Sequence, residues 1–159
     1  MSRFTHLLAA TDGSPLATMA LERAIALAAD ADAALTIVTV TEPPPTFDTG
    51  ELGWSLPADA LTRIRDGDAA RSRTILEAAT ASARRHGVAA RAIHVSDEGP
   101  ARGIIDTARA CGADLIVMAS HGRRGFNRLL LGSQAAKVLA LSEVAVLIAK
   151  PPAAEQQAS

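Results

Sequence analysis

Apolar residues in this chain fall into two kinds of stretch, which alternate from one end to the other. Short, nearly continuous apolar runs rich in branched residues are typical of strands buried on both faces of a parallel sheet. Between these runs, apolar residues recur every three or four positions, which is the period of an amphipathic helix. The pattern predicts strands over residues 6–11, 34–41, 89–95, 114–118 and 144–150.

Capping residues mark the ends of the predicted helices. Ser14 is expected to cap the first helix, with Pro15 at its first position. Gly87 and Gly112 stand where they would end the second and third helices. These two helices are predicted over residues 60–86 and 100–111, and a fourth over 134–141. The inward stripes are expected to contain Leu16, Ala20, Ala24 and Leu27 in the first helix, Ile75, Leu76, Ala79 and Ala83 in the second, and Ile104, Ile105 and Ala108 in the third.

The order of these elements predicts an α/β fold. We expect an open, doubly wound, five-stranded parallel sheet of Rossmann-like form, flanked by about four helices. The 159 residues suit one domain over residues 1–152, with residues 153–159 disordered beyond Pro151 and Pro152. Sheets of this kind bind ligands beyond the carboxyl ends of the strands, where the strand order reverses. The functional site is therefore expected at that edge.

Composition and charge narrow the possible functions. The net charge of −1 and the absence of Tyr argue against a basic or aromatic surface that binds nucleic acid. No apolar run approaches the ~20 residues of a membrane span, and no secretory signal opens the chain. The single Cys111 cannot form a disulfide within the chain, which favours a reducing compartment. We therefore expect a cytoplasmic protein that binds neither nucleic acid nor a membrane.

The motif after the fourth predicted strand points to phosphate. Ala-Ser-His-Gly at residues 119–122 follows the strand, and Gly132-Ser133 opens the next helix. A loop between a strand end and a helix N-terminus presents unpaired N–H groups and the positive end of the helix dipole, which bind anions. Neither a Walker-type loop nor Gly-x-Gly-x-x-Gly occurs, since the first strand runs into Thr-Asp-Gly-Ser at 11–14. The sequence thus predicts an anion site of another type.

Five further segments can be compared with known families. They are the Asp-Gly-Ser-Pro turn at 12–15, Gly-Ala-Asp-Leu-Ile-Val-Met at 112–118, Ser-His-Gly-Arg-Arg-Gly at 120–125, Leu-Leu-Leu-Gly-Ser at 129–133 and Val-Ala-Val-Leu-Ile at 144–148. Together they resemble the universal stress protein family. The resemblance covers residues 3–150 and implies a fold like that of the adenine nucleotide alpha hydrolases.

The ATP-binding branch of that family has the signature Gly-x2-Gly-x9-Gly-Ser/Thr. On this chain it falls on Gly122, Gly132 and Ser133, with Ala119 in place of the first glycine. If Ala119 has an extended φ, its methyl group is tolerated. If the position requires a positive φ, alanine costs about 1–2 kcal/mol, or roughly a tenfold loss of affinity. Gly132 is likewise expected to have a positive φ and a close approach to phosphate.

The resemblance assigns a role to individual positions. Asp12 would accept from the ribose hydroxyls, although a carboxylate there could equally cap the first helix beside Ser14. The backbone of Val40 would engage the adenine edge, and Ser133 would donate to phosphate or serve only as an N-cap. The implied nucleotide-binding residues are Thr11, Asp12, Val40, Met118, Ala119, Gly122, Arg123, Arg124, Gly132 and Ser133.

The expected function is a stress-response binding module for ATP, or for ADP or AMP, with Mg²⁺ as a possible companion. We do not expect an enzyme, because His121 has no catalytic partner nearby in the sequence. A nucleotide-independent dimeric scaffold and a slow ATPase using Asp12 are the alternatives. The family resemblance also implies a homodimer through the last strand, at Val144, Val146 and Ile148.

The connection over residues 42–59 is rich in Pro and Gly and is expected to be irregular. It holds Trp54, the only Trp of the chain. Two interpretations stay open: Trp54 covers a ligand or a partner, or it anchors the loop itself.

Overall fold

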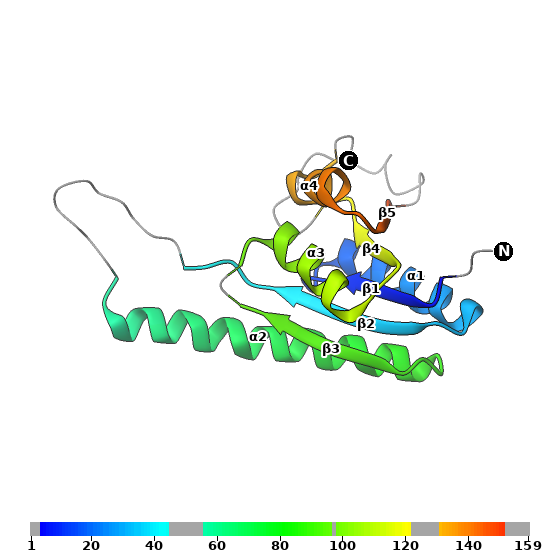
Figure 1. The fold of residues 1–159 in the computed structure, drawn as a ribbon. Coiled ribbons are helices and arrows are strands. Elements are labelled where there is room, and N and C mark those ends of the chain that lie inside the picture. Colours follow the sequence, from blue (N-terminus) through cyan, green and yellow to red (C-terminus); the bar gives the residue numbers. More distant parts are fainter. Residues whose placement is uncertain (1–3, 45–55, 97, 122–130, 152–159) are drawn as a thin grey trace.

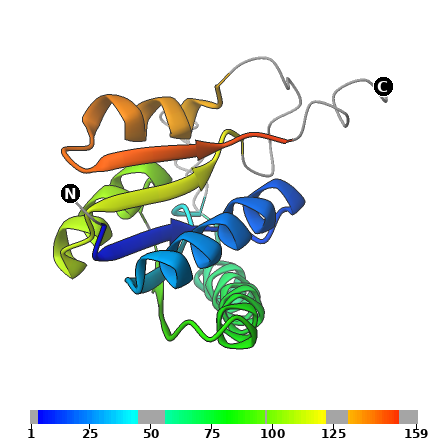
Figure 2. The ribbon, with the colours of Figure 1, turned by 90° about the vertical axis from the view of Figure 1, so that its right-hand side faces the viewer.

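Five parallel strands form a single sheet in the order β3-β2-β1-β4-β5. The structure is a computed structural model that describes residues 4–44, 56–96, 98–121 and 131–151. Helices α1 and α2 cover one face of the sheet, and α3 and α4 cover the other (Figure 1, Figure 2). The predicted doubly wound α/β fold is confirmed.

The strands begin and end within one residue of their predicted bounds. Thr11 follows β1 instead of ending it, because its N–H donates to Val38 O (2.9 Å) and the chain then turns away from the sheet. Ala119, by contrast, belongs to β4 as its last residue. The bounds are His6–Ala10 for β1, Ala34–Val40 for β2, Ala90–Val95 for β3, Leu115–Ala119 for β4 and Ala145–Ala149 for β5.

The helices follow their local signals closely. Ser14 Oγ accepts a hydrogen bond from Ala17 N (3.2 Å), which confirms it as the N-cap of α1. Gly112 ends α3 in the left-handed conformation, with φ of 70°. Of the described helices, none is long and apolar enough to cross a membrane. The bounds are Pro15–Ala31 for α1, Ala58–Arg85 for α2, Pro100–Cys111 for α3 and Ser133–Leu141 for α4.

Successive side chains of a strand point to opposite faces of the sheet, and this divides the interior into two cores. Residues at odd positions of β1 and β2 face α1 and α2, where Leu7 and Ile37 are fully buried. Residues at even positions face α3 and α4, where Leu8 and Val38 are fully buried. Both faces of the three central strands, β2, β1 and β4, are therefore buried, as their continuous apolar runs predict.

The inward faces of α1 and α2 differ in part from the predicted stripes. Leu27 was predicted to be buried but is 36% exposed, because α1 is rotated so that Ala24, Ile25 and Ala28 contact the sheet. On α2 the buried set includes two hydroxyl residues that the apolar pattern could not mark, Ser72 and Ser82.

Asp114 ties the start of β4 to the start of β1. Its carboxylate accepts from Thr5 N (2.8 Å), Thr5 Oγ1 (2.9 Å) and His6 N (3.2 Å). Burial raises the pKa of Asp114, but the hydrogen bonds from Thr5 and His6 together lower it more, so the pKa lies below its ordinary value of 3.8. The ionised carboxylate thus stabilises the folded state.

We expect Asp114→Asn to lower the free energy of unfolding by about 1 kcal/mol at pH 7. The NH2 group of asparagine cannot accept the hydrogen bonds that Thr5 and His6 donate to the carboxylate. A depressed carboxyl pKa stabilises the fold above the unfolded pKa of about 3.9, and this stabilisation is lost as the pH falls through the lower folded pKa. The difference between wild type and variant should therefore shrink as the pH falls below about 4. Urea unfolding at neutral and acid pH measures it, and an undiminished difference in acid would contradict the ionised role.

Candidate functional site

The early end of β1 opens a cleft at the carboxyl edge of the sheet. The ladder between β1 and β4 stops at Ala9↔Val117, whereas β4 continues to Ala119. On the other side, β1 leaves β2 after Ala10↔Val38, whereas β2 continues to Val40. The strand order reverses at β1, so the cleft occupies the predicted switch point.

The cleft has a volume of about 990 Å³. That is the size of a pocket for a small organic ligand. Helix α4 contributes Ser133 and Gln134 to its lining, and α3 contributes Ile104. The lining residues at the strand ends and just after them include Thr11, Asp12, Val40, Thr41, Met118, Ala119 and His121.

The backbone of Val40 lacks its strand partner. Thr41 N donates to Val95 O (2.9 Å), so the backbone groups of Thr41 face β3. Along a strand these groups alternate in direction, so the N–H and C=O of Val40 face the side of β1, as Val38 O does. Because β1 has already ended, neither group of Val40 has a hydrogen bond within the described part of the chain. A donor and an acceptor therefore stand side by side on the cleft wall.

Thr11 and Asp12 form the floor of the cleft and the turn into α1. Asp12 Oδ1 accepts from Ser14 N (3.0 Å), and Thr11 Oγ1 accepts from Gly13 N (3.2 Å). Asp12 thus supports the turn, while Ser14 itself caps α1. Gly13 has φ of 77°, and a Cβ atom there would lie 2.8 Å from Ile75 Cγ1. The turn consequently packs directly against α2.

Ala119 has no left-handed backbone. Asp32 is the single non-glycine residue with a positive φ among those described, and Ala119 is the last residue of β4. Its methyl group packs in a cluster with Ala17, Ala20 and Ala149, and Ala119 is 7% exposed. Of the two backbone conformations that the sequence left open for Ala119, the structure therefore shows the extended one.

Gly132 joins the end of β4 to the start of α4. Its N–H donates to Ser120 O (2.8 Å), and as the N-cap it has φ of −62°. The expected positive φ at Gly132 is therefore wrong. Close packing explains the glycine instead, because a Cβ atom there would lie 2.8 Å from Ser120 O. Ser133 is the exposed first residue of α4 and not its N-cap, and it lines the cleft.

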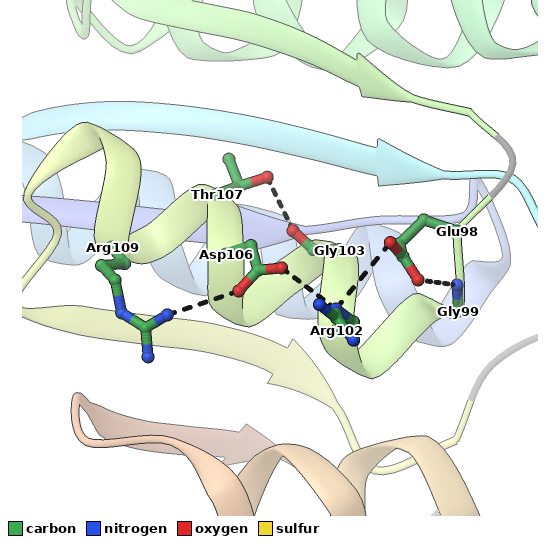
Figure 3. Close-up of polar contacts among 7 residues, drawn as sticks. All are labelled: Glu98, Gly99, Arg102, Gly103, Asp106, Thr107 and Arg109. Atoms are coloured by element: carbon green, nitrogen blue, oxygen red, sulfur yellow. Dashed lines mark hydrogen bonds and ion pairs between the residues drawn. The ribbon is translucent and has the colours of Figure 1, made fainter.

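Helix α3 supports Val40 from the other face of the sheet. A Cβ atom on Gly103 would lie 2.9 Å from Val40 Cγ1, so only glycine allows this approach. The exposed side of α3 carries ion pairs from Arg102 to Glu98 (3.9 Å) and Asp106 (3.4 Å), as Figure 3 shows. Exposed pairs of this kind stabilise a fold weakly. The close approach of Gly103 packs α3 directly against the strand end at Val40.

Helix α2 supplies a wall that sequence reasoning missed. Its first half extends beyond the carboxyl ends of β2 and β3 (Figure 1). The spacing of 64, 68, 71, 72 and 75 is that of one helical face, which is the signal that could have found it. The cleft-lining residues of this wall are Ile64, Asp68, Arg71, Ser72 and Ile75.

Charges in the described part of the cleft are mixed. Asp68 forms an ion pair with Arg71 on the α2 wall, and Asp12 and Glu42 line the cleft as well. Among the described residues, no three His, Cys, Asp or Glu side chains come together to hold a metal ion. His121 Nδ1 lies 3.3 Å from Ser120 Oγ.

Several predicted residues lie outside the described ranges. They are Gly122, Arg123 and Arg124 of the expected phosphate loop, Trp54 of the long connection, and residues 153–159. Of the remaining predicted site residues, all but Gly132 line the cleft, and Gly132 adjoins it through Ser120.

Strand β5 forms one edge of the sheet. It pairs with β4 alone within the described residues. Val146 and Ile148 are half-buried and pack against the core beneath α3 and α4, and Val144 precedes the strand. Leu139 and Leu141 on the neighbouring α4 are exposed by 45% and 66%.

Comparison with known proteins shows one consistent likeness. A family model described as "Universal stress protein family" matches residues 3–150. Universal stress protein YxiE of Bacillus subtilis is 34% identical over 92% of this chain and 99% of its own length. In structure, universal stress protein UspA from Lactobacillus plantarum aligns with a TM-score of 0.81 at 22% identity, over 94% of this chain and 100% of that one.

Some of the solved structures contain adenine nucleotides. A universal stress protein in complex with cAMP aligns with a TM-score of 0.67 at 26% identity, over 94% of this chain and 98% of that one. Other structures of the same fold hold dAMP or AMP.

Proposed function

Since this chain belongs to the universal stress protein family, we propose that it binds an adenine nucleotide in the cleft beside β1 and acts as a stress-response binding module. One observation carries the proposal: the unpaired N–H and C=O of Val40 on the cleft wall. Adenine presents an acceptor, N1, next to a donor, the exocyclic amine. A strand edge that has lost its partner offers the complementary pair, and leaving both groups without a partner costs free energy.

The rest of the nucleotide follows from the position of the base. Asp12 lines the same cleft as Val40 and would accept from the ribose. The phosphates would then extend towards the N-terminus of α4, where Ser133 is exposed and the helix dipole favours anions. We assign Gly122, Arg123 and Arg124, which precede α4 in the sequence, to the same proposed phosphate site.

The relatives that hold cAMP, dAMP and AMP support an adenine nucleotide as the ligand class. Within this class we propose ATP, with Mg²⁺ carried on its phosphates, and a second copy of this chain as partner across the open edge of β5. The lone Cys111 fits the reducing cytoplasm.

Two measurements test the proposal. Freshly purified protein is denatured, and any released nucleotide is identified by mass spectrometry. Protein freed of nucleotide is then titrated with AMP, and with ATP in the presence of Mg²⁺, by calorimetry. Saturable binding of at least one of them is expected. If neither binds at millimolar concentration, the protein is a nucleotide-independent scaffold and the proposal fails.

Ala119→Gly should change the affinity for AMP by no more than about twofold. Alanine already has the extended backbone of a strand there, and its methyl group contacts Ala17 and Ala20 on α1. A tenfold gain in the glycine variant would instead show that the methyl group crowds the ligand. The same calorimetric titration of the two proteins measures the difference.

A further inference from the structure

Among the residues that the structure describes, two buried hydroxyl groups of the cleft have no hydrogen-bond partner. Thr39 on β2 is 3% exposed and Ser72 on α2 is 1% exposed, and both line the cleft. Within the described part of the chain, neither hydroxyl makes a side-chain hydrogen bond, although every fully enclosed polar side-chain atom there has a partner. The two oxygens must therefore still reach the space of the cleft.

Other buried hydroxyls in the same elements are satisfied. Thr36, three residues before Thr39 on β2, bonds His6 Nε2 (2.9 Å). Ser82, ten residues after Ser72 on α2, donates to Glu22 Oε1 (2.6 Å). Buried polar groups are nearly always paired, so an unpaired hydroxyl facing a cleft points to a ligand atom.

The two hydroxyls approach from one side of the sheet. Thr39 is at an odd position of β2, like Leu35 and Ile37, so its side chain faces the α1 and α2 layer. Ser72 lies one turn before Ile75, which contacts the Gly13 turn. Thr39 from β2 and Ser72 from α2 thus line the part of the cleft between the strand end at Val40 and α2, where the proposed base would lie.

The charge of the α2 wall indicates which part of the ligand lies against it. Arg71 is paired with Asp68, so this wall carries no net charge, and its other cleft-lining residues are Ile64, Ser72 and Ile75. A partly apolar wall with no net charge and one buried hydroxyl suits a purine nucleoside and not a phosphate.

We propose that Thr39 and Ser72 are specificity residues that hydrogen-bond the nucleoside end of the bound nucleotide from the α2 side. This inference rests on the proposed function, because it requires an adenine nucleotide in the cleft. Each hydroxyl then adds one hydrogen bond to the contacts expected from Val40 and Asp12.

The test removes each hydroxyl with little change of shape, in Thr39→Val and Ser72→Ala, and measures Kd for AMP by calorimetry. Each change should weaken binding about three- to tenfold, the effect of one lost hydrogen bond. The stability of these variants should stay close to that of the wild type, since neither hydroxyl has a partner to lose.

Matched controls on the same two elements are Thr36→Val and Ser82→Ala. Both break a hydrogen bond within the protein, so they should lower the urea midpoint and leave Kd unchanged. ATP should be weakened by the same factor as AMP in the Thr39 and Ser72 variants, because the two ligands share the nucleoside.

Three results would overturn the inference. The first is an unchanged Kd in both test variants while the wild type binds AMP. The second is an equal loss of affinity in the controls, and the third is a loss confined to ATP, which would place the hydroxyls at the phosphates. Failure of the wild type to bind AMP and ATP would instead reject the proposed function itself.

Discussion

Gly132→Val is expected to weaken AMP binding at least tenfold and to lower the free energy of unfolding by about 1–3 kcal/mol. A Cβ atom at this position would lie 2.8 Å from Ser120 O and 3.3 Å from His121 Cδ2. Ser120 O belongs to the backbone and accepts from Gly132 N, so it cannot rotate away. The start of α4 must shift instead, and the proposed phosphate contacts of Ser133 shift with it.

Gly99→Val is the matched control for this change. Gly99 is also a helix N-cap, with φ of −64° against −62° for Gly132, but a Cβ atom on Gly99 meets nothing within 4 Å. Its Kd for AMP should stay within about twofold of the wild type. Calorimetry and urea unfolding of both variants measure the difference. Wild-type affinity in Gly132→Val would show that the start of α4 is not part of the ligand site.

Leu8→Ala is expected to lower the free energy of unfolding by about 3 kcal/mol. Leu8 is fully buried at the centre of the sheet, on β1 between β2 and β4, and it packs in one cluster with Val38 and Ile116. Such a core cannot collapse around the missing atoms without moving a strand, so a cavity remains. A loss of this size is a large part of the roughly 5–15 kcal/mol that stabilises a typical domain.

Leu27→Ala removes the same atoms from a site that is 36% exposed on α1. Alanine is at least as good a helix former as leucine, so the expected loss is below about 1 kcal/mol. Urea unfolding of the two variants gives the comparison. Equal losses would contradict the orientation of α1 and support the stripe predicted from the sequence.

The order and bounds of the elements were predictable because their causes are local. Ser14 caps α1 and Gly112 ends α3 through contacts within a few residues. The buried strands carry their own signal in continuous apolar runs. Val40 and Asp12 were assigned through the family resemblance, and the structure places both on the cleft that β1 leaves open.

The α2 wall was not predictable in the same way. Apolar periodicity marked Ile75, Leu76, Ala79 and Ala83, but it cannot show that Ser72 faces a cleft and not solvent. That depends on how α2 is rotated against the sheet and how far it extends beyond β2. Hydroxyl residues are also common on solvated helix faces. Only the packing of the folded chain therefore shows that Ser72 is buried, with 1% exposure.

By itself, the sequence determined the α/β order, the caps and the glycine motif that ends at Ser133, because each depends on neighbours in the chain. The tertiary structure decided what the motif means at its two unusual positions. Ala119 is extended because β4 continues to it beside β5, and Gly132 is required because Ser120 O lies against it. The unpaired backbone of Val40 likewise exists only because a different strand, β1, ends before β2 does. No residue near Val40 in the sequence carries that information.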